Sequence, residues 1–275
     1  MSKLVSILLP TYNGAKRIKD SIESILGQSH TLLELIVVDD GSDDDTKKVI
    51  EELVKIDQRI RYIRNEKNLG IQKSLNRGLN ESKGEYVARI DDDDLWIEKD
   101  KLKDQIEFLE RNKDYVLVGT GFIAVNENGE EIFRQINPIL DQDIRSKILS
   151  KNCFVHSGVV FRKDIALECG GYSESEEIKH IEDYDLWLKL GNIGKLANLA
   201  TYSVRLILRE GSISSKNKIS QLKQSIKIIK KFRDKYPNHT KAVISLSMRL
   251  FVYRVFQMTP LRYLSNKMYK LYKNI

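Results

Sequence analysis

The stretch Gly84-Glu-Tyr-Val-Ala-Arg-Ile-Asp-Asp-Asp-Asp-Leu-Trp96 decides the fold class of this chain. A glycine turn leads into a short apolar run typical of a buried strand, which ends in four consecutive aspartates, Asp91 to Asp94. Four adjacent carboxylates repel one another, and a bound cation would remove that repulsion. Ligands of open α/β sheets bind outside the carboxyl ends of the strands. The pattern therefore predicts a Mg²⁺ or Mn²⁺ site that holds phosphates, with a solvated acidic turn as the alternative.

The residues before this stretch alternate between apolar runs and amphipathic segments. We expect strands at residues 3–9, 32–38 and 59–64, and helices at residues 17–26, 43–56 and 70–82. Ser42 or Asp43 is a suitable cap for the second of these helices. Such regular alternation indicates an α/β fold with a mostly parallel central sheet flanked by helices.

The rhythm changes after a helix expected at residues 99–111. We expect strands at 115–125, around Ile132 and Phe133, at 155–161 and at 199–208, and helices at 141–150, from 181, and from 218 onward with breaks near Pro237 and Pro260. We therefore divide the chain into residues 1–112 and 113–215, as two halves of one domain, and a basic helical extension at 216–275.

Three of the predicted strands end in polar groups. These groups are Pro10-Thr-Tyr-Asn13, Asp39-Asp40 and Asp91 to Asp94. The carboxyl ends of parallel strands meet at one edge, so we expect the three to converge. Tyr12 could stack on a nucleobase while Asp40 accepts one of its N–H groups, and the aspartate run could hold a diphosphate through a metal. Taken singly, Asp39-Asp40 could equally be a turn with a helix cap, and Tyr12 an ordinary packed side chain.

A second acidic site, Glu182-Asp-Tyr-Asp185, opens a later helix. Carboxylates at a helix start interact favourably with the macrodipole, which is a purely structural explanation. The functional interpretation is a general base that takes a proton from an incoming hydroxyl group.

Six short motifs stand in the order and spacing of family 2 glycosyltransferases. They are Pro10-Thr-Tyr-Asn13, Val38-Asp-Asp-Gly-Ser42, Asn68-Leu-Gly70, Gly84-Glu-Tyr86, Asp91-Asp-Asp-Asp94 and Glu182-Asp-Tyr-Asp-Leu-Trp187. The chain resembles that family over roughly residues 3–215. The resemblance implies a GT-A (Rossmann-like) fold and an inverting transfer of a hexosyl or N-acetylhexosaminyl group from a nucleotide-sugar, most often a UDP-sugar. It also implies Mn²⁺ or Mg²⁺ as cofactor and a role in bacterial surface polysaccharide synthesis.

The resemblance also assigns roles to single residues. Asp93 matches the main metal ligand, with Asp91 as a second ligand, and Asp91 and Asp92 lie close to the ribose and the metal. The donor nucleotide positions that match are Pro10, Tyr12, Asn13, Asp40 and Gly70. Asp183 matches the catalytic base of the inverting members.

The segment Ile207-Leu-Arg-Glu-Gly-Ser-Ile-Ser214 departs from the family pattern. Arg209 stands where many relatives have a histidine that approaches the metal or the diphosphate. An arginine can contact a diphosphate but cannot ligate a metal, which leaves the metal's remaining ligands open. Glu182 and His156 are further candidates for diphosphate or acceptor contacts, although His156 could also be a plain loop residue.

The charge of the chain is unevenly distributed. Residues 216–275 carry 15 Lys and Arg against one acid, Asp234, whereas residues 1–215 have a net charge of −7. With apolar residues interleaved, the extension predicts basic amphipathic helices on an anionic membrane surface, near a glycan or lipid-linked acceptor. A solvated helical cap or an oligomer contact is the alternative. Cys153 and Cys169 fit a reducing compartment, so we expect a cytoplasmic protein peripheral to the inner face of the membrane.

Other functional classes fit less well. A catalytically inactive nucleotide-binding module of the same fold is the main alternative. In a receiver-like signalling domain the acidic pair follows the first strand, which here ends in Pro10-Thr-Tyr-Asn13. A nucleic-acid binder is disfavoured by the acidic body, and a glycosidase would leave Tyr12 and Asp40 without a role. The N-terminal apolar run stops at Pro10, so we expect no signal peptide there, and because the apolar runs are short we expect no segment that crosses a bilayer. The transferred sugar, the acceptor and the oligomeric state are not encoded in any motif.

Overall fold

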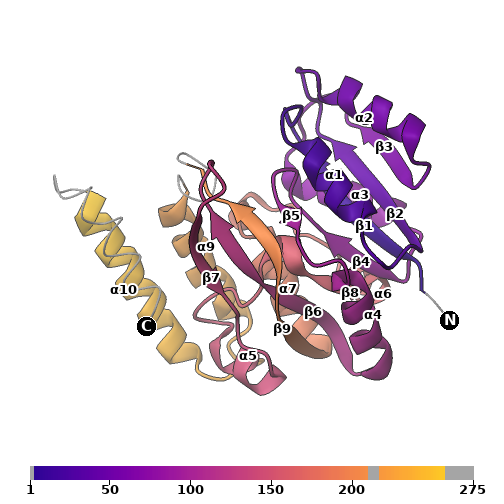
Figure 1. Cartoon of the computed structure of the whole chain (residues 1–275). Helices are drawn as coiled ribbons and strands as arrows, with labels where there is room; N and C mark the ends of the chain where they lie inside the picture. The colour runs from indigo at the N-terminus through magenta and orange to yellow at the C-terminus, as the bar shows by residue number, and fades with distance from the viewer. Residues whose placement is uncertain (1–2, 210–216, 258–275) are drawn as a thin grey trace.

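The computed structural model describes residues 3–209 and 217–257, which form one α/β body with helices on both faces of a sheet (Figure 1). The strands are β1 (Val5–Thr11), β2 (Leu33–Asp39), β3 (Ile60–Arg64), β4 (Tyr86–Arg89), β5 (Leu95–Trp96), β6 (Tyr115–Val125), β7 (Glu131–Gln135), β8 (Val160–Arg162) and β9 (Lys195–Ile207). The helices are α1 (Ile18–Leu26), α2 (Thr46–Ile56), α3 (Ile71–Glu81), α4 (Lys101–Arg111), α5 (Asp141–Lys147), α6 (Lys163–Glu168), α7 (Glu182–Ile193), α9 (Lys218–Lys231) and α10 (His239–Gln257).

The described strands form one sheet in the order β3-β2-β1-β4-β8-β6-β9-β5, with β7 paired to β6. Its first half, from β3 to β4, is entirely parallel. Strand β8 joins it antiparallel to β4 and β6, and β6 pairs parallel with β9. The predicted α/β class with a largely parallel sheet is therefore confirmed. Because β1, β2 and β4 are parallel neighbours, their carboxyl ends at Thr11, Asp39 and Arg89 lie at one edge.

The sheet is buried on both faces, which explains why its first strands are almost continuously apolar. Val5, Ile7 and Leu9 of β1 pack with the buried faces of α1 and α4, while Leu8 packs with α3. Successive strand residues point to opposite faces, so one strand supplies both hydrophobic cores. This rigid sheet fixes the positions of the loops at its carboxyl edge.

Two local predictions were wrong. The strand expected at 155–161 begins only at Val160, because His156–Gly158 forms a 3₁₀ turn that directs Ser157 toward the acidic run. Neither Ser42 nor Asp43 caps α2. Asp44 Oδ1 accepts the Thr46 N–H at 2.9 Å, whereas Ser42 faces the preceding loop.

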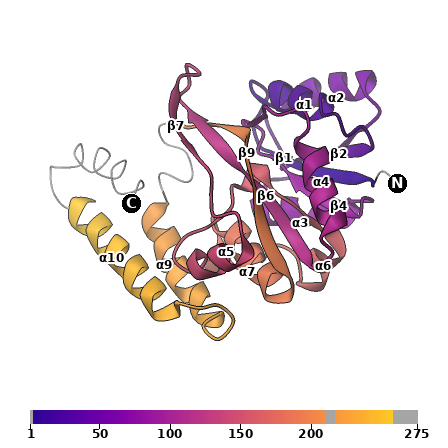
Figure 2. The same ribbon diagram turned by 60° about the horizontal axis from the view of Figure 1, so that its bottom comes forward.

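The C-terminal helices pack on the second half of the domain (Figure 2). Ile228 and Ile229 of α9 are buried in the core that contains α7, and the Tyr236 hydroxyl donates to the Leu188 carbonyl at 2.7 Å. The predicted break near Pro237 is confirmed, because α9 and α10 are separate helices. Pro260 lies outside the described residues. Within residues 3–209 and 217–257, no helix combines the length and apolar character needed to cross a bilayer.

Candidate active site

Hydrogen bonds connect the three strand ends that carry the polar motifs. The Thr11 carbonyl accepts the Asp40 N–H at 2.8 Å, which ties the end of β1 to the end of β2. The Thr11 hydroxyl donates to Asp92 Oδ2 at 2.5 Å, which ties β1 to the run after β4. The predicted convergence at one sheet edge is therefore confirmed.

The loop after β1 presents an aromatic ring to solvent. Tyr12 is 45% exposed, while Pro10 just before it is buried within β1. Asn13 has a left-handed φ of 53°, and its N–H donates to Ser42 Oγ at 2.9 Å. Its side-chain oxygen accepts the Asp43 N–H at 3.0 Å. Asn13 thus connects the loop after β1 to the loop after β2. The exposed Tyr12 ring next to it is available for stacking.

The Asp40 carboxylate faces the segment that follows β3. It is 5% exposed and accepts from Asn65 Nδ2 at 2.7 Å, the Leu69 N–H at 2.9 Å and the Gly70 N–H at 2.8 Å. Gly70 has a φ of 92°, a conformation that favours glycine. The role visible in these contacts is to shape the 68–70 loop. Nucleobase recognition by Asp40 stays a prediction, and it would use the carboxylate's remaining acceptor capacity.

Three carboxylates of the acidic run each lie beside an arginine. Arg89 forms a bidentate ion pair with Asp91, with both nitrogen–oxygen distances at 2.5 Å. Arg17 Nη2 lies 3.6 Å from Asp92 Oδ2. Arg209 Nη1 lies 3.6 Å from Asp93 Oδ2. The fourth, Asp94, accepts the Ser157 hydroxyl. The sequence predicts a bound cation that removes the repulsion in this run, and the structure adds that the chain also supplies arginine cations of its own.

The arginines do not fully offset the cost of gathering these acids. Burial raises the pKa of Asp92 to about 6 despite the Thr11 hydroxyl and Arg17. Burial first, and the Asp91 charge second, raise the pKa of Asp93, and the same two causes raise the pKa of Asp94 well above its usual range. A site whose carboxyl groups resist ionisation retains an attraction for added positive charge.

The arrangement fits a divalent ion that a ligand helps to hold. Among the described residues, no group of three or more His, Cys, Asp or Glu is placed to hold a metal. Mg²⁺ in nucleotide sites is typically bound by one or two carboxylates plus substrate phosphates rather than by a protein cage. Asp91 and Asp93 have side chains 42% and 31% exposed and can offer oxygens, whereas Asp92 is more deeply buried. The oxygen donors therefore suit Mn²⁺ or Mg²⁺.

Asp183 and Glu182 stand in the first turn of α7. The Asp183 carboxylate accepts Asn152 Nδ2 at 2.7 Å. Burial raises the pKa of Asp183, and burial together with the Asp183 charge raises the pKa of Glu182 to about 7. Arg89 lowers the pKa of both acids, while Asp91 raises it. The second acidic motif is therefore within electrostatic range of the first, and it can hold or release a proton near neutral pH.

His156 is half-buried and packs against Tyr172 and Trp187. Its Nε2 lies 3.2 Å from the Tyr172 hydroxyl. Its ring and the Trp187 ring are packed edge to face, with their centroids 5.6 Å apart. Burial and the Arg89 charge lower the pKa of His156 well below its usual range. The imidazole is therefore neutral at physiological pH, and it touches α7 through Trp187.

Sequence reasoning missed the residues that hold the acids in place: Arg17, Arg89, Asn152 and Ser157. Arg89 had a readable signal, because a charged residue inside an apolar strand is buried only if it is paired. Ser157 had none. Its hydroxyl accepts the Asp91 N–H at 3.0 Å and its carbonyl accepts Trp96 Nε1 at 2.7 Å, contacts that depend on the 3₁₀ turn.

Gly14 leaves no room for a side chain beside the acidic run. A Cβ there would collide with Asp92 Oδ2 and Thr11 Oγ1. We expect Gly14→Ala to lower the free energy of unfolding by about 1–3 kcal/mol, because the buried Thr11–Asp92 pair would have to separate. Chemical denaturation measures this loss. Gly27→Ala is the matched control, since its Cβ meets nothing nearer than the Glu23 carbonyl at 3.3 Å; equal losses in both variants would contradict the expectation.

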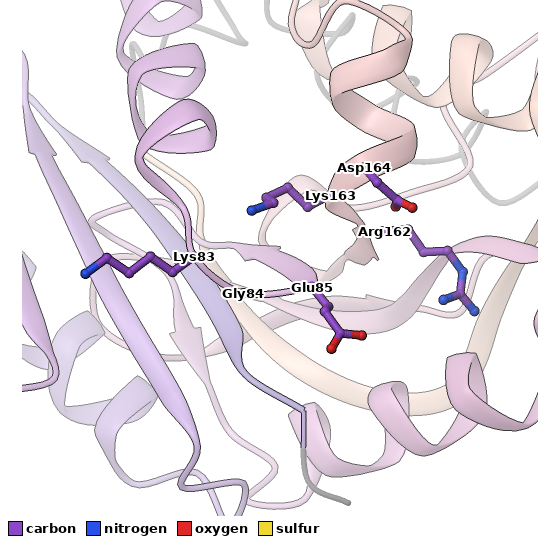
Figure 3. A pocket seen from close by; sticks show the side chains of 6 residues that line it. All are labelled: Lys83, Gly84, Glu85, Arg162, Lys163 and Asp164. Atoms are coloured by element: carbon purple, nitrogen blue, oxygen red, sulfur yellow. The ribbon is translucent and has the colours of Figure 1, made fainter.

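A cavity of about 220 Å³ lies away from these acids (Figure 3). It is lined by Lys83, Gly84, Glu85, Arg162, Lys163 and Asp164. Glu85 directly precedes β4, so the cavity lies at the opposite edge of the sheet from Asp91. Lys163 donates to the Ser82 carbonyl at 2.9 Å, and Arg162 donates to the Leu109 carbonyl at 2.7 Å. These two cations hold the backbone, and the cavity contributes nothing to the site above.

The sequence and fold resemble those of known glycosyltransferases. The model of the family "Glycosyl transferase family 2" matches residues 6–170. The amylovoran biosynthesis glycosyltransferase AmsE of Erwinia amylovora is 32% identical over 212 residues, covering 76% of this chain and 77% of AmsE. The O-antigen biosynthesis glycosyltransferase WbnJ of Escherichia coli is 33% identical over 196 residues, covering 69% and 72%. The chain therefore belongs to glycosyl transferase family 2.

Solved structures show the same fold. Staphylococcus aureus TarS 1–349 in complex with UDP-GlcNAc superposes with a TM-score of 0.69 at 21% identity, covering 93% of this chain and 73% of that chain. The mannosyltransferase PcManGT of Pyrobaculum calidifontis, in complex with GDP-Man and Mn²⁺, has a TM-score of 0.66 at 18% identity, covering 98% and 81%. The expected GT-A architecture is thereby confirmed.

Proposed function

We propose that this glycosyltransferase moves a sugar from a nucleotide-sugar, a UDP-sugar first, to a hydroxyl group with inversion at the anomeric carbon. The observation that carries the proposal is Arg89, which is 2% exposed and pairs with Asp91. Its charge also lowers the pKa of Asp183 and Glu182. One buried guanidinium thus pairs with a carboxylate of the proposed diphosphate site and also acts electrostatically on the proposed base.

Each part of the site has a role in this proposal. The Tyr12 ring stacks on the nucleobase, supported by Pro10 and Asn13, and the 68–70 loop held by Asp40 borders the nucleotide. Asp183 takes the proton of the acceptor hydroxyl as its oxygen attacks the anomeric carbon, and the nucleoside diphosphate leaves from the opposite face. Glu182 and His156 border the acceptor side. Holding two substrates in line supplies a large part of the rate.

Asp93 and Asp91 are the residues that would hold Mn²⁺ or Mg²⁺. The metal, when bound, stabilises the negative charge that develops on the departing diphosphate. Arg209 is placed to contribute to the same stabilisation, because it lies 3.6 Å from Asp93 and can move from that carboxylate to a phosphate oxygen. Residues 1–112 then form the donor half of the domain, and residues 113–215 the acceptor half.

The setting of the reaction is also proposed. The names of AmsE and WbnJ associate them with polysaccharide biosynthesis, which supports a glycan or lipid-linked acceptor for this chain. The described part of the extension, residues 217–257, carries ten Lys and Arg and one acid. Such a charge favours an anionic surface. We place the enzyme at the cytoplasmic face of the membrane, as a peripheral protein transferring a hexosyl or N-acetylhexosaminyl group.

A thermal-shift panel of UDP, GDP, dTDP and CMP, each with Mn²⁺ or with EDTA, tests the donor assignment. A ligand at 100 times its Kd stabilises a fold by about 2.7 kcal/mol, which is readily measured. We expect the largest shift with UDP and Mn²⁺. A shift with another nucleotide would keep the enzyme class and change the donor. No shift with any of the four would favour an inactive module of this fold.

A further inference from the structure

The outermost helix, α10, is apolar on two opposite faces. Its inner face buries Ala242 and Leu246, which are 2% and 4% exposed. Among the large apolar side chains exposed on its outer face are Ile244, Met248, Phe251 and Val252, with exposed fractions of 56%, 60%, 68% and 45%. Their spacing of four, three and one residues places them on one stripe of the helix. We call these four residues the α10 stripe.

An apolar face of a helix in a globular protein normally packs against another element. Yet α10 lies at the periphery in both views, beside α9 (Figures 1 and 2). Single exposed apolar residues occur elsewhere, such as Ile56 on α2 at 81%. A contiguous stripe is different, because clustered exposed apolar side chains mark interaction surfaces.

Charge selects the kind of partner. The exposed side chains of Lys241 and Arg254 flank the stripe on the same helix, whereas Arg249 donates to the Ser150 carbonyl at 3.1 Å. With α9 included, residues 217–257 hold ten Lys and Arg against Asp234 alone. Two copies docked stripe to stripe would bring two cationic surfaces together and repel each other. An anionic surface would gain from the same charges, by about 1 kcal/mol for each Lys or Arg close to it.

We propose that the α10 stripe inserts into the interface of an anionic lipid bilayer, with the flanking Lys and Arg among the headgroups. Helices of this kind lie in the plane of the interface with their apolar side chains between headgroups and acyl chains. The inference rests on the proposed function, because it names the surface of the protein that makes the membrane contact proposed there. It assigns the contact to one face of α10, because α9 buries its apolar Ile228 and Ile229 within the protein.

Vesicle co-sedimentation tests the assignment, with phosphatidylcholine vesicles containing or lacking phosphatidylglycerol. We expect the full chain to bind the anionic vesicles at low salt, and a variant carrying Met248→Ser and Phe251→Ser to bind at least tenfold more weakly. Ile56→Ser, which removes an exposed apolar side chain from α2, should bind like the wild type. Far-UV circular dichroism and the shift with UDP and Mn²⁺ should be unchanged in all variants. The nucleotide shift thus tests the proposed function separately from the membrane contact.

Three results would overturn the proposal. The first is equal binding by the wild type and the double variant, or no binding to anionic vesicles at all. The second is a dimer, seen by analytical ultracentrifugation, that the double variant abolishes, because the occupant would then be a second copy. The third is vesicle binding that occurs only after removal of residues 258–275, because that segment would then be the occupant. Loss of binding above about 0.5 M salt would support the charge contribution.

Discussion

Asp183→Asn is expected to lower kcat by about 10²- to 10⁴-fold while leaving the Kd for UDP nearly unchanged. The substitution keeps the size of the side chain but removes its ability to accept a proton, and a positioned general base contributes a factor of this order. Asp183 ends beside Asn152, on the side of the site formed by α7 and the residues after α5. The proposed nucleotide contacts lie on the loops after β1, β2, β3 and β4 rather than on α7, so donor binding should be little affected.

Initial rates and isothermal titration with UDP measure the two quantities separately. Asn152→Ala is the matched control, because it removes the hydrogen bond to Asp183 but keeps the carboxylate. We expect Asn152→Ala to reduce kcat much less than Asp183→Asn. If Asp183→Asn and Asp93→Ala weakened UDP binding equally, Asp183 would belong to the donor site and its assignment as the base would fail.

The same residue sets the direction of the pH dependence. A base must be ionised to accept a proton, and burial raises the pKa of Asp183 above the usual aspartate range. Burial and the Asp183 charge raise the pKa of the neighbouring Glu182 to about 7. Activity in the wild type should therefore rise with pH through an apparent pKa that belongs to the pair. If the rate were instead constant at every pH above the usual aspartate pKa, the shift caused by burial would be contradicted.

Much of the site could be predicted because it follows from strand order. The carboxyl ends of β1, β2 and β4 had to meet once the sheet was recognised as parallel there, so the positions of Tyr12, Asp40 and Asp91 relative to the sheet edge followed. The opening of α7 at Glu182 was also readable, because acids are favourable in a first turn. These features depend on periodicity and on local chemistry, which a sequence displays directly.

The partners of the acids could not be predicted, because they come from distant segments. Arg17 reaches Asp92 from the start of α1, while Arg209 reaches Asp93 from beyond β9. No spacing rule relates such positions, so the acidic run looked uncompensated. Asp40 shows the same limit, since its hydrogen bond to Asn65 requires the register of β3 beside β2. A motif identifies a carboxylate, but only the packed structure shows how many donors it already satisfies.

Asp93→Ala is expected to weaken UDP binding by about tenfold or more in Mn²⁺, with little change in EDTA. Asp93 is less buried than Asp92, and the substitution removes an oxygen that could bind a metal. Isothermal titration with UDP in each buffer gives the metal-dependent and metal-independent parts of the affinity. Loss of the same size in both buffers would show that Asp93 acts through the fold rather than through a metal.

Arg209→Gln separates the contribution of the arginine from that of the metal. Arg209 lies 3.6 Å from Asp93 and 3.6 Å from Glu127, so it can help to neutralise a diphosphate whether or not a metal is present. We expect this variant to bind UDP more weakly by a similar factor in Mn²⁺ and in EDTA, which is the opposite pattern to Asp93→Ala. If Arg209→Gln instead strengthened binding in Mn²⁺ alone, the arginine would compete with the metal for Asp93, and its proposed role toward the diphosphate would be wrong.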